Sequence, residues 1–494
     1  MTELVAYLVP LVPALPAAMA LLMLAARTPR AADRLNLAAA PLVAAAALVL
    51  AGTAIARGGA GPLRATWYLV DGASGVFLAV IAVVGCASAL LSPAYLRTAG
   101  RSWSSATGSR TWYYVALYLF WAALLAVPVV GNLGVAWLLL EATTVASALL
   151  VAFSGRRNAL EAGWKYLVLT TLGLAVALLG IVVVAILQNA AGRHGVHALD
   201  WHALQTNAAT LPHDATLFAF VLVLAGLLAK AGLAPVHNWL PDAHSEAPAP
   251  VSALLSASLL PTVVLVAWRV NATLGAGVGA DTADALFIGF GLASMIVAVP
   301  FLWRPLPFKR LLAYSSLEHM GVIALGVGFG TPLAIAGVVL HVAGHALAKS
   351  LGFYASIGLL RADPSAATQP ASGVLLHSRP TAIAIGVSLA ALAGLPPSPL
   401  FVSELLILLG GVAAGHVAVA AVAVIALALG FLGLLHALLE GVLGEPGRTR
   451  SRRHRERPLV AVTGVLGAGL LALLAAAALL PGSEFAAALA RGAL

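Results

Sequence analysis

The stretch KAGLAPVHNWLPDAHSEAPAPVSALLS, residues 230–256, places a lysine, two histidines, an aspartate and a glutamate among prolines and apolar residues. It directly follows an apolar run, so these ionisable groups are expected at the depth of a lipid bilayer. Charged side chains are expensive there, and those that occur normally line an ion pathway or a water-filled cavity. Pro235 follows Lys230 by five residues and must interrupt a helical hydrogen-bond ladder. A broken helix at this depth normally lines a cavity.

The composition is that of a membrane protein. Of the 494 residues, 61% are hydrophobic and 9% are charged, and the mean hydropathy is +1.00. These values exclude an ordinary soluble globular chain. Because a helix needs roughly 20 apolar residues to cross a bilayer, the apolar runs predict an all-α polytopic membrane protein. We expect about fourteen spans, at residues 4–26, 36–56, 73–96, 112–131, 133–154, 163–188, 215–235, 248–272, 284–303, 313–330, 332–360, 379–412, 416–440 and 458–480.

Basic residues are distributed unevenly between alternate loops. With the N-terminus outside, twenty of them fall in cytoplasmic loops and five on the opposite side, whereas Lys230 and Lys349 lie inside spans. Cytoplasmic loops carry the excess of lysine and arginine in membrane proteins. The sequence therefore predicts that both termini lie outside. We interpret the basic run Arg448–Arg457 as a solvated loop beside lipid, so nucleic acid is not an expected partner.

Several kinds of chemistry are excluded by what the sequence lacks. Cys86 is the single cysteine, so an intrachain disulfide and a cysteine-ligated iron–sulfur or zinc site cannot form. Neither GxGxxG nor GxxxxGK[ST] occurs, so nucleotide chemistry would have to come from a partner. The first apolar run is long and has no basic segment before it, which argues against a cleaved signal peptide. We expect no cofactor and no metal in this chain.

Further polar residues lie inside predicted spans. Glu141 stands in AWLLLEATTVASALLVAF, between apolar residues and small ones. His341, His345 and Lys349 are spaced four apart, so their side chains stack along one helix face and could form a proton wire. Glu404 follows a second break, GLPPSPLFVSE, where three prolines interrupt a span. Two broken helices, one in each half, are typical of inverted-repeat transporters.

Each of these residues also has a purely structural interpretation. Glu141 and Lys230 could form a fixed ion pair. His341 or His345 could donate to a backbone carbonyl and never change its protonation. Asp242, His244 and Glu246 could cap helices at the membrane surface, and Glu318 and His319 could belong to the conduit or to a cytoplasmic gate. His237 is a further candidate.

The quoted residues resemble those of a known family. KAGLAPVHNWLPDAHSEAPAPVSALLS is similar to the signature of the antiporter-like membrane subunits shared by respiratory complex I, energy-converting hydrogenases and multisubunit cation/proton antiporters. WLLLEATTVASALLVAF, FKRLLAYSSLEHMGVIALG, HVAGHALAKSLGFY and GLPPSPLFVSELLIL also resemble family segments, in the family's order, so the resemblance covers most of the chain. The segments DAHSEAP and SSLEHMG resemble component F of hydrogenase-4 more than the complex I subunits.

The resemblance implies a row of ionisable groups at mid-membrane depth, joined to half-channels that reach each side. The family's glutamate on its fifth helix corresponds to Glu141, and its lysine on the broken seventh helix to Lys230. Its histidine and lysine stripe corresponds to His341, His345 and Lys349, and its ionisable residue on the broken twelfth helix to Glu404. In this scheme Lys230 keeps its proton while paired with a carboxylate and gives it up when the pair opens.

The resemblance also implies an organisation and partners. Helices 1–3 would occupy residues 1–110, two inverted five-helix repeats with broken helices 7 and 12 would occupy 111–272 and 273–440, and a basic cytoplasmic loop with helix 14 would occupy 441–494. The chain would be a non-redox subunit in the inner membrane of a prokaryote. Its partners would be other membrane subunits, a peripheral redox arm with iron–sulfur and possibly nickel–iron subunits, protons and lipid.

One departure from the family and two alternative functions follow. Many members carry lysine or histidine on the eighth helix, at a position aligned to Pro261, so either Ser256 or Ser258 with water bridges the gap or the pathway is incomplete. The chain could instead belong to a sodium/proton antiporter without redox coupling, or be a scaffold that has lost pumping. Sodium needs oxygen ligands, and the carboxylates within spans are mainly Glu141 and Glu404, which favours protons.

Overall fold

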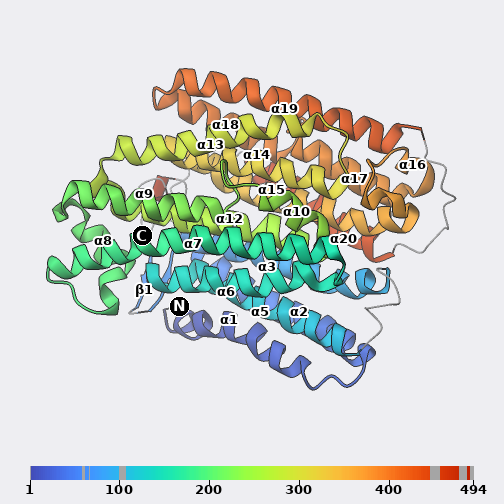
Figure 1. The fold of residues 1–494 in the computed structure, drawn as a ribbon, viewed down its shortest axis with the longest axis horizontal. Coiled ribbons are helices and arrows are strands. Elements are labelled where there is room, and N and C mark those ends of the chain that lie inside the picture. Colours follow the sequence, from blue (N-terminus) through green and yellow to red (C-terminus); the bar gives the residue numbers. More distant parts are fainter. Residues whose placement is uncertain are drawn as a thin grey trace.

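The computed structural model describes residues 2–57, 62–65, 67–98, 107–445, 457–477 and 487–489. In this part of the chain, thirteen helices are long and apolar enough to cross a membrane. They run side by side in one bundle (Figure 1). Their bounds are α1 Thr2–Met23, α2 Pro29–Ala56, α3 Gly72–Thr98, α5 Thr107–Ala126, α6 Leu133–Val151, α7 Arg157–Ala190, α9 His213–Lys230, α12 Leu260–Val278 (continuing α11 Ala249–Leu254), α13 Ala280–Leu302, α14 Phe308–Phe329, α15 Pro332–Ala362, α19 Val417–Leu443 and α20 Arg457–Ala477.

Two shorter apolar helices, α17 Arg379–Leu392 and α18 Pro399–Ala413, supply the remaining crossing. The predicted spans therefore all correspond to helices, and the predicted fold class, an all-α polytopic membrane protein, is confirmed. The division into two inverted five-helix repeats stays a prediction. The smaller described elements are α8 Trp201–Asn207, α10 Trp239–Glu246, α16 Val374–His377 and the antiparallel strands β1 Leu63–Arg64 and β2 Leu69–Val70.

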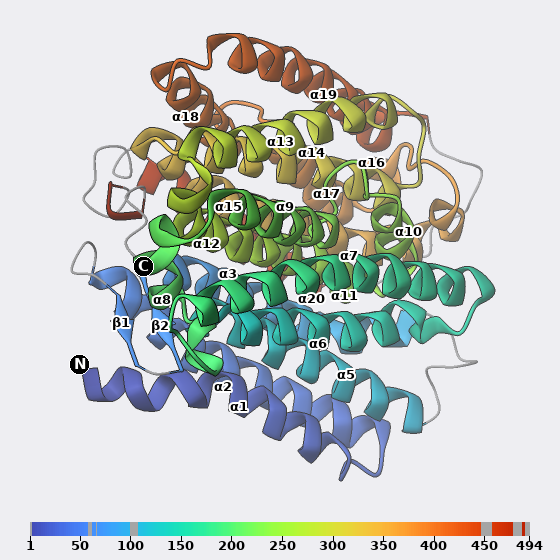
Figure 2. The ribbon, with the colours of Figure 1, turned by 60° about the vertical axis from the view of Figure 1, so that its left-hand side comes forward.

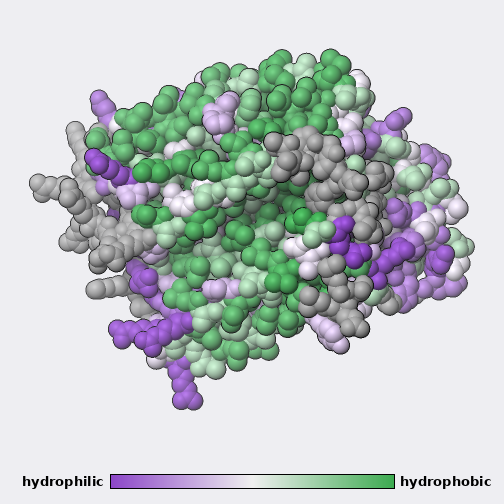
Figure 3. All heavy atoms as spheres, turned by 180° about the vertical axis from the view of Figure 1, so that it is seen from behind, coloured by the Kyte–Doolittle hydropathy of each residue, from purple (hydrophilic) through white to green (hydrophobic). Residues whose placement is uncertain are grey.

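The surface has the polarity that a membrane requires. In Figure 3 the middle of the bundle is covered by hydrophobic residues, and hydrophilic residues gather at the two ends of the helices. Large apolar side chains such as Leu138, Leu149 and Leu172 are 60%, 63% and 61% exposed on this belt. The chain is thus a multi-pass membrane protein. The basic residues 448–456 of the predicted loop lie outside the described part of the chain.

Both expected helix breaks are present. Helix α9 ends at Lys230, Gly232 takes φ 75°, the Ala234–Pro235 peptide is cis, and α10 begins at Trp239. In the second break α17 ends at Leu392, and Gly394, with φ 69°, precedes a cis peptide between two prolines. Left-handed φ values favour glycine, which has no Cβ. Ser398 then caps α18 by accepting a hydrogen bond from the Phe401 amide at 3.1 Å.

The eighth crossing, formed by α11 and α12, contains a further irregularity. Residues Leu255–Leu259 form a π-helical turn between α11 and α12, and Pro261 lies in the first turn of α12. A π turn is a local widening that is often found at functional sites. Proline has no N–H, so in the middle of a regular helix it would interrupt the backbone hydrogen bonds. Its place just after the π turn avoids part of that interruption. Pro261 is fully buried in the bundle.

A buried ion pair ties the eighth crossing to α3. The Arg269 guanidinium donates to both carboxylate oxygens of Asp71, at 3.0 and 3.2 Å, and to the Ser74 hydroxyl at 2.8 Å. The side chains are 3% and 4% exposed. A buried pair of this kind holds two helices in register, and removal of one partner leaves an uncompensated charge.

Candidate functional site

Helices α6, α7 and α9 bring the first group of predicted residues together. The Lys230 ammonium lies at the end of α9, is fully buried, and donates to the hydroxyls of Thr144 at 2.7 Å and Tyr166 at 2.9 Å. Tyr166 OH in turn lies 2.8 Å from the Ser147 hydroxyl. The Glu141 carboxylate accepts from Thr171 at 2.8 Å, and its second oxygen lies 3.5 Å from the Thr144 hydroxyl.

Glu141 and Lys230 are therefore connected through Thr144. No direct ion pair within 4.0 Å joins the two among the described residues, which differs from the fixed ion pair of the structural interpretation. The reason is local packing, since Thr144 lies one turn after Glu141 on α6 and occupies the space between carboxylate and ammonium. A hydroxyl can accept a hydrogen bond and donate one at the same time. The single Thr144 hydroxyl proton has two acceptors, the Leu140 carbonyl at 3.1 Å and the Glu141 carboxylate at 3.5 Å. A small shift would therefore place Thr144 to relay a proton between Glu141 and Lys230.

The second group of residues lies on α14 and α15, in the centre of the bundle (Figure 2). Lys349 is fully buried on α15, and its Nζ donates to the Leu312 carbonyl at 2.6 Å and to the Ser315 hydroxyl, both on α14. His345 lies one turn earlier on α15, and neither of its ring nitrogens has a hydrogen-bond partner in the described part of the protein. Buried polar groups usually have partners, so an open imidazole at this position is suited to exchanging protons with water.

His341 joins this group to α18. Its Nε2 lies 3.0 Å from Nδ1 of His319 on α14, and its Nδ1 lies 2.9 Å from the Ser403 hydroxyl on α18. The ring of His319 is also 5.2 Å from that of His345. A neutral imidazole accepts a proton at one nitrogen and donates one from the other. His319 thus belongs to the buried row itself, although the sequence placed it among the less certain candidates.

Two carboxylates complete this end of the row. Glu404 follows Ser403, and its carboxylate lies over Gly394 in the helix break, where a Cβ would collide with it. Its donor atoms, with those of His319 and His341, lie within 4.8 Å of one another. This histidine and carboxylate set is the one described group that could hold a metal ion. Glu318 is buried against Gly430 of α19, close to the row.

Hydroxyl groups of the eighth crossing reach the surroundings of Lys349. Ser256, in the π turn of the eighth crossing, is 2.8 Å from Ser316 of α14. Ser316 donates to the Leu312 carbonyl, which also accepts from Lys349. Ser258 is buried, and its hydroxyl has no partner among the described residues. Ser256 thus connects to the Lys349 group, and no hydrogen bond among the described residues joins these serines to Lys230.

The residues of α10 lie toward the basic-loop end of the bundle and divide into two kinds. Asp242 and Glu246 form surface ion pairs, Asp242 with Arg310 at 3.1 Å and with Lys165 at 3.6 Å, and Glu246 with Arg156 at 3.3 Å. His244 is fully buried and stacks on the ring of Phe353 at 5.7 Å. His237 lies in the break before α10, outside the buried row.

Sequence reasoning missed the groups that hold the lysines and histidines. These are the hydroxyls of Thr144, Tyr166, Ser315 and Ser403. Sequence reasoning also missed Lys309, at the start of α14, which donates to a carbonyl at the end of α10. A weak signal existed for the hydroxyls, because Thr144 is one turn from Glu141 and Ser403 precedes Glu404. Common residues such as these carry no ligand signature, so their role depends on which helices pack together.

Ionisable and hydroxyl groups form a buried row across this membrane bundle. Such an architecture is typical of a multi-pass ion-translocation subunit. Residues 130–430 match the family described as "NADH:quinone oxidoreductase/Mrp antiporter, TM". The chain belongs to this family, which confirms the resemblance seen in the sequence.

Relatives and a solved structure agree with that assignment. The chain is 32% identical over 384 residues to a "Hydrogenase-4 component F homolog" of Methylacidiphilum infernorum, covering 77% of this chain and 80% of the relative. It is 29% identical over 395 residues to "NADH-quinone oxidoreductase subunit N" of Desulforudis audaxviator, covering 78% and 75%. A chain of the Mrp complex from Dietzia sp. DQ12-45-1b has the same fold, with a TM-score of 0.80 at 22% identity over 100% of both chains.

Proposed function

We propose that this chain is the proton-translocating membrane subunit of a hydrogenase-4-like or complex I-like redox complex. Electron transfer would occur in partner subunits, and this chain would move protons along its mid-membrane row without a redox centre of its own. We place it in the cell membrane of a prokaryote with both termini outside, which the uneven distribution of basic residues supports.

The observation that carries the proposal is a set of buried ionisable and hydroxyl groups that extends from α6 to α18. It begins at Glu141 on α6, passes Lys230 on α9 and Lys349 on α15, and ends at Glu404 on α18. Helices α1 and α2 lie at one edge of the bundle and α18 and α19 at the other in both ribbon views (Figures 1 and 2), so the row crosses the bundle parallel to the membrane. Ionisable groups at this depth are expensive and are retained where they serve transport.

The row works by alternating states of its lysines. When Glu141 moves past Thr144 to contact Lys230, the charged ammonium is stabilised, and when the carboxylate moves away, burial disfavours that charge and the proton passes on. Moving one charge against 100 mV costs about 2.3 kcal/mol, so a small rearrangement is sufficient. The serines at Ser256 and Ser316 would carry the proton toward Lys349, with water beside them.

The ends of the row indicate where partners bind. Glu141 and Glu404 are partly exposed in the isolated chain, whereas Lys230, His341, His345 and Lys349 are fully buried. A carboxylate facing hydrocarbon is unfavourable, so neighbouring membrane subunits would cover both ends. The hydrogenase-4 relationship of the first relative supports a peripheral arm with iron–sulfur and nickel–iron subunits.

Sodium/proton antiport without redox coupling is the second candidate, because the Mrp chain shares the whole fold. Nitrogen donors and hydroxyls dominate the row, whereas a sodium site needs a cage of oxygen ligands. The experiment that separates the two is gentle purification from native membranes, followed by mass spectrometry and metal analysis. Iron with nickel, or iron alone, in co-purifying subunits supports the redox assignment. Small membrane subunits without iron would contradict it and leave the antiporter.

A further inference from the structure

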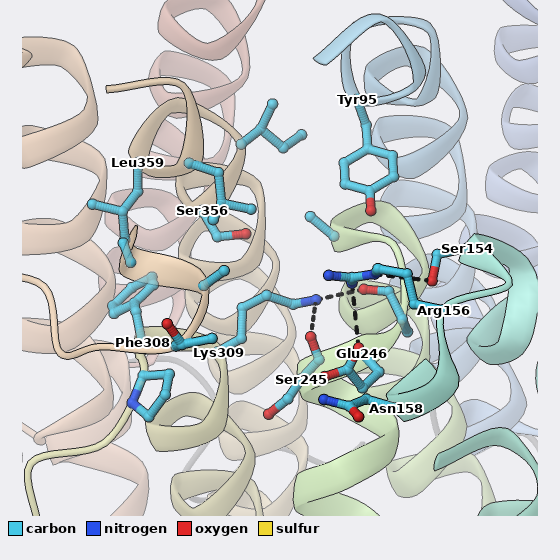
Figure 4. A pocket seen from close by; sticks show the side chains of 18 residues that line it. Tyr95, Ser154, Arg156, Asn158, Ser245, Glu246, Phe308, Lys309, Ser356 and Leu359 are labelled. Atoms are coloured by element: carbon cyan, nitrogen blue, oxygen red, sulfur yellow. Dashed lines mark hydrogen bonds and ion pairs between the residues drawn. The ribbon is translucent and has the colours of Figure 1, made fainter. Parts of the chain in front are cut away.

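A cavity of about 300 Å³ lies between α3, α10, α14 and α15 at the end of the bundle that carries the basic loops. Figure 4 shows the side chains of Tyr95, Arg156, Glu246 and Lys309 arranged around it. The Arg156 and Glu246 side chains at its rim are 62% and 23% exposed and pair at 3.3 Å. The cavity therefore connects polar groups inside the bundle with the surface.

Lys309 forms the inner wall of this cavity. Its Nζ donates to the carbonyl of Ser245, in the last turn of α10, at 2.8 Å and to that of Ala247, the residue after the helix. These carbonyls have no partner within the helix, and a cation at a helix C-terminus is favourable. No carboxylate lies within 4.0 Å of Lys309 Nζ in the described part of the chain, so its hydrogen bonds are to the carbonyls at the end of α10. Lys309 thus fixes the end of the helix that carries His244.

His244 lies between this cavity and the buried row. It is fully buried, one residue before Ser245, and stacks on Phe353. Phe353 follows Lys349 by four residues, so the two share one face of α15. The backbone of Ser252 approaches the His244 ring, but neither ring nitrogen makes a hydrogen bond of normal geometry among the described residues. A histidine with a structural role would normally be hydrogen-bonded, which leaves this imidazole free to exchange protons.

We propose that the cavity is a proton entrance from the basic-loop side that joins the row at Lys349, in its second half, by way of His244. Glu246 gathers protons at the rim, and Lys309 is a positioning residue. His244 accepts a proton from a hydronium ion in the cavity at one ring nitrogen, which leaves water, and releases a proton from the other nitrogen to the neutral amine of Lys349. The lysine gains one proton, and the imidazole ends neutral in its other tautomer, which a flip of the ring resets. The inference rests on the proposed function and adds the side of the membrane from which the second half of the row is loaded.

The test uses inverted membrane vesicles that contain the complete complex, with proton uptake and electron transfer measured in parallel. His244→Phe keeps a ring stacked on Phe353 and removes the proton carrier. We expect its proton uptake per electron to fall about 100-fold, and we expect added imidazole to restore uptake in His244→Ala. Lys165→Met is the matched control, since it removes a cation from the same end of the bundle outside the cavity and should leave uptake unchanged.

A second measurement does not depend on a buried substitution. In a Cys86→Ser background, Asn158→Cys at the cavity rim is treated with a positively charged methanethiosulfonate, and Leu376→Cys, exposed at the same end, serves as control. Labelling at position 158 should lower uptake about tenfold, by blocking access, and removal of the label by a reductant should restore it.

The outcomes separate this inference from the proposed function. If Lys349→Met stops proton uptake while His244→Phe and labelled Asn158→Cys behave like the wild type, the entrance is elsewhere and the function stands. If Lys349→Met also pumps normally, the proposed function itself fails.

Discussion

The two buried lysines lie in different surroundings. Lys230 is held by two hydroxyls, those of Thr144 and Tyr166, and its carboxylate is one hydroxyl away. Lys349 is held by a carbonyl and a serine, and three histidines follow it toward α18. Hydroxyls thus make the contacts of the first lysine, whereas imidazoles make up most of the second half of the row, and in the proposed mechanism these groups relay the proton.

This difference bears on how each half controls a proton. Hydroxyls transfer a proton without holding a charge, because they are too weakly basic to be protonated near neutral pH, so control must come from the Glu141 carboxylate. Imidazoles can hold a proton, so the second half can store one on the way to Glu404. The first half is accordingly a switch and the second half a chain of holding sites. This distinction predicts different effects of substitution in the two halves.

The largest effect is expected from removing either lysine. Lys230→Met and Lys349→Met should each lower protons moved per electron by about 1,000-fold, because each removes the carrier at which its half is loaded. The two variants should be equally defective even though their surroundings differ. Pumping measured in vesicles, with assembly checked by the amount of co-purified partner, tests this. A variant that assembles and pumps normally would show that its half is not on the path.

A smaller effect is expected from breaking the imidazole chain. His341→Leu removes the contacts with His319 and Ser403 and should lower pumping about 100-fold. His416→Leu is the matched control, since that histidine stacks on Phe329 away from the row. Equal pumping by the two variants would mean that the histidine row is structural.

The hydroxyls should show a still smaller and unequal effect. Thr144→Val keeps the shape of the side chain and removes the link between Glu141 and Lys230, and loss of about 1 kcal/mol would slow transfer about fivefold. Ser403→Ala should have less effect, because His341 retains its contact with His319. Single-turnover proton release would resolve the two rates. A larger effect of Ser403→Ala would reverse the proposed roles of the two halves.

The smallest effect on pumping is expected outside the row. Asp71→Asn weakens the buried pair with Arg269 and should destabilise the protein by about 3–5 kcal/mol, seen as a lower melting temperature in detergent. Protons moved per electron should stay unchanged in the molecules that remain folded. A lower ratio at normal stability would place this pair on the proton path and not among structural contacts.

Much of the fold could be predicted, because hydrophobic runs indicate the membrane-spanning helices and the loop charges test how many there are. The breaks at Pro235 and at Pro396 were evident, since proline cannot continue a regular helix. Six ionisable residues of the row were evident too, because charges in apolar runs are rare. The link through Thr144 and the place of Lys309 at α10 could not be predicted, since both depend on which helices lie together. Pro261 leaves the eighth crossing without an ionisable group at that position. The π turn just before it places the Ser256 hydroxyl 2.8 Å from that of Ser316.

The central claim is that this row moves protons in a redox complex. The most direct measurement is uptake of protons and of radioactive sodium by inverted vesicles during turnover of the complex, with the wild-type chain and with Lys349→Met. The account predicts proton uptake that needs electron transfer, persists when sodium is replaced by choline, and disappears in the variant. Sodium movement that continues without electron transfer, or uptake unchanged in the variant, would contradict it.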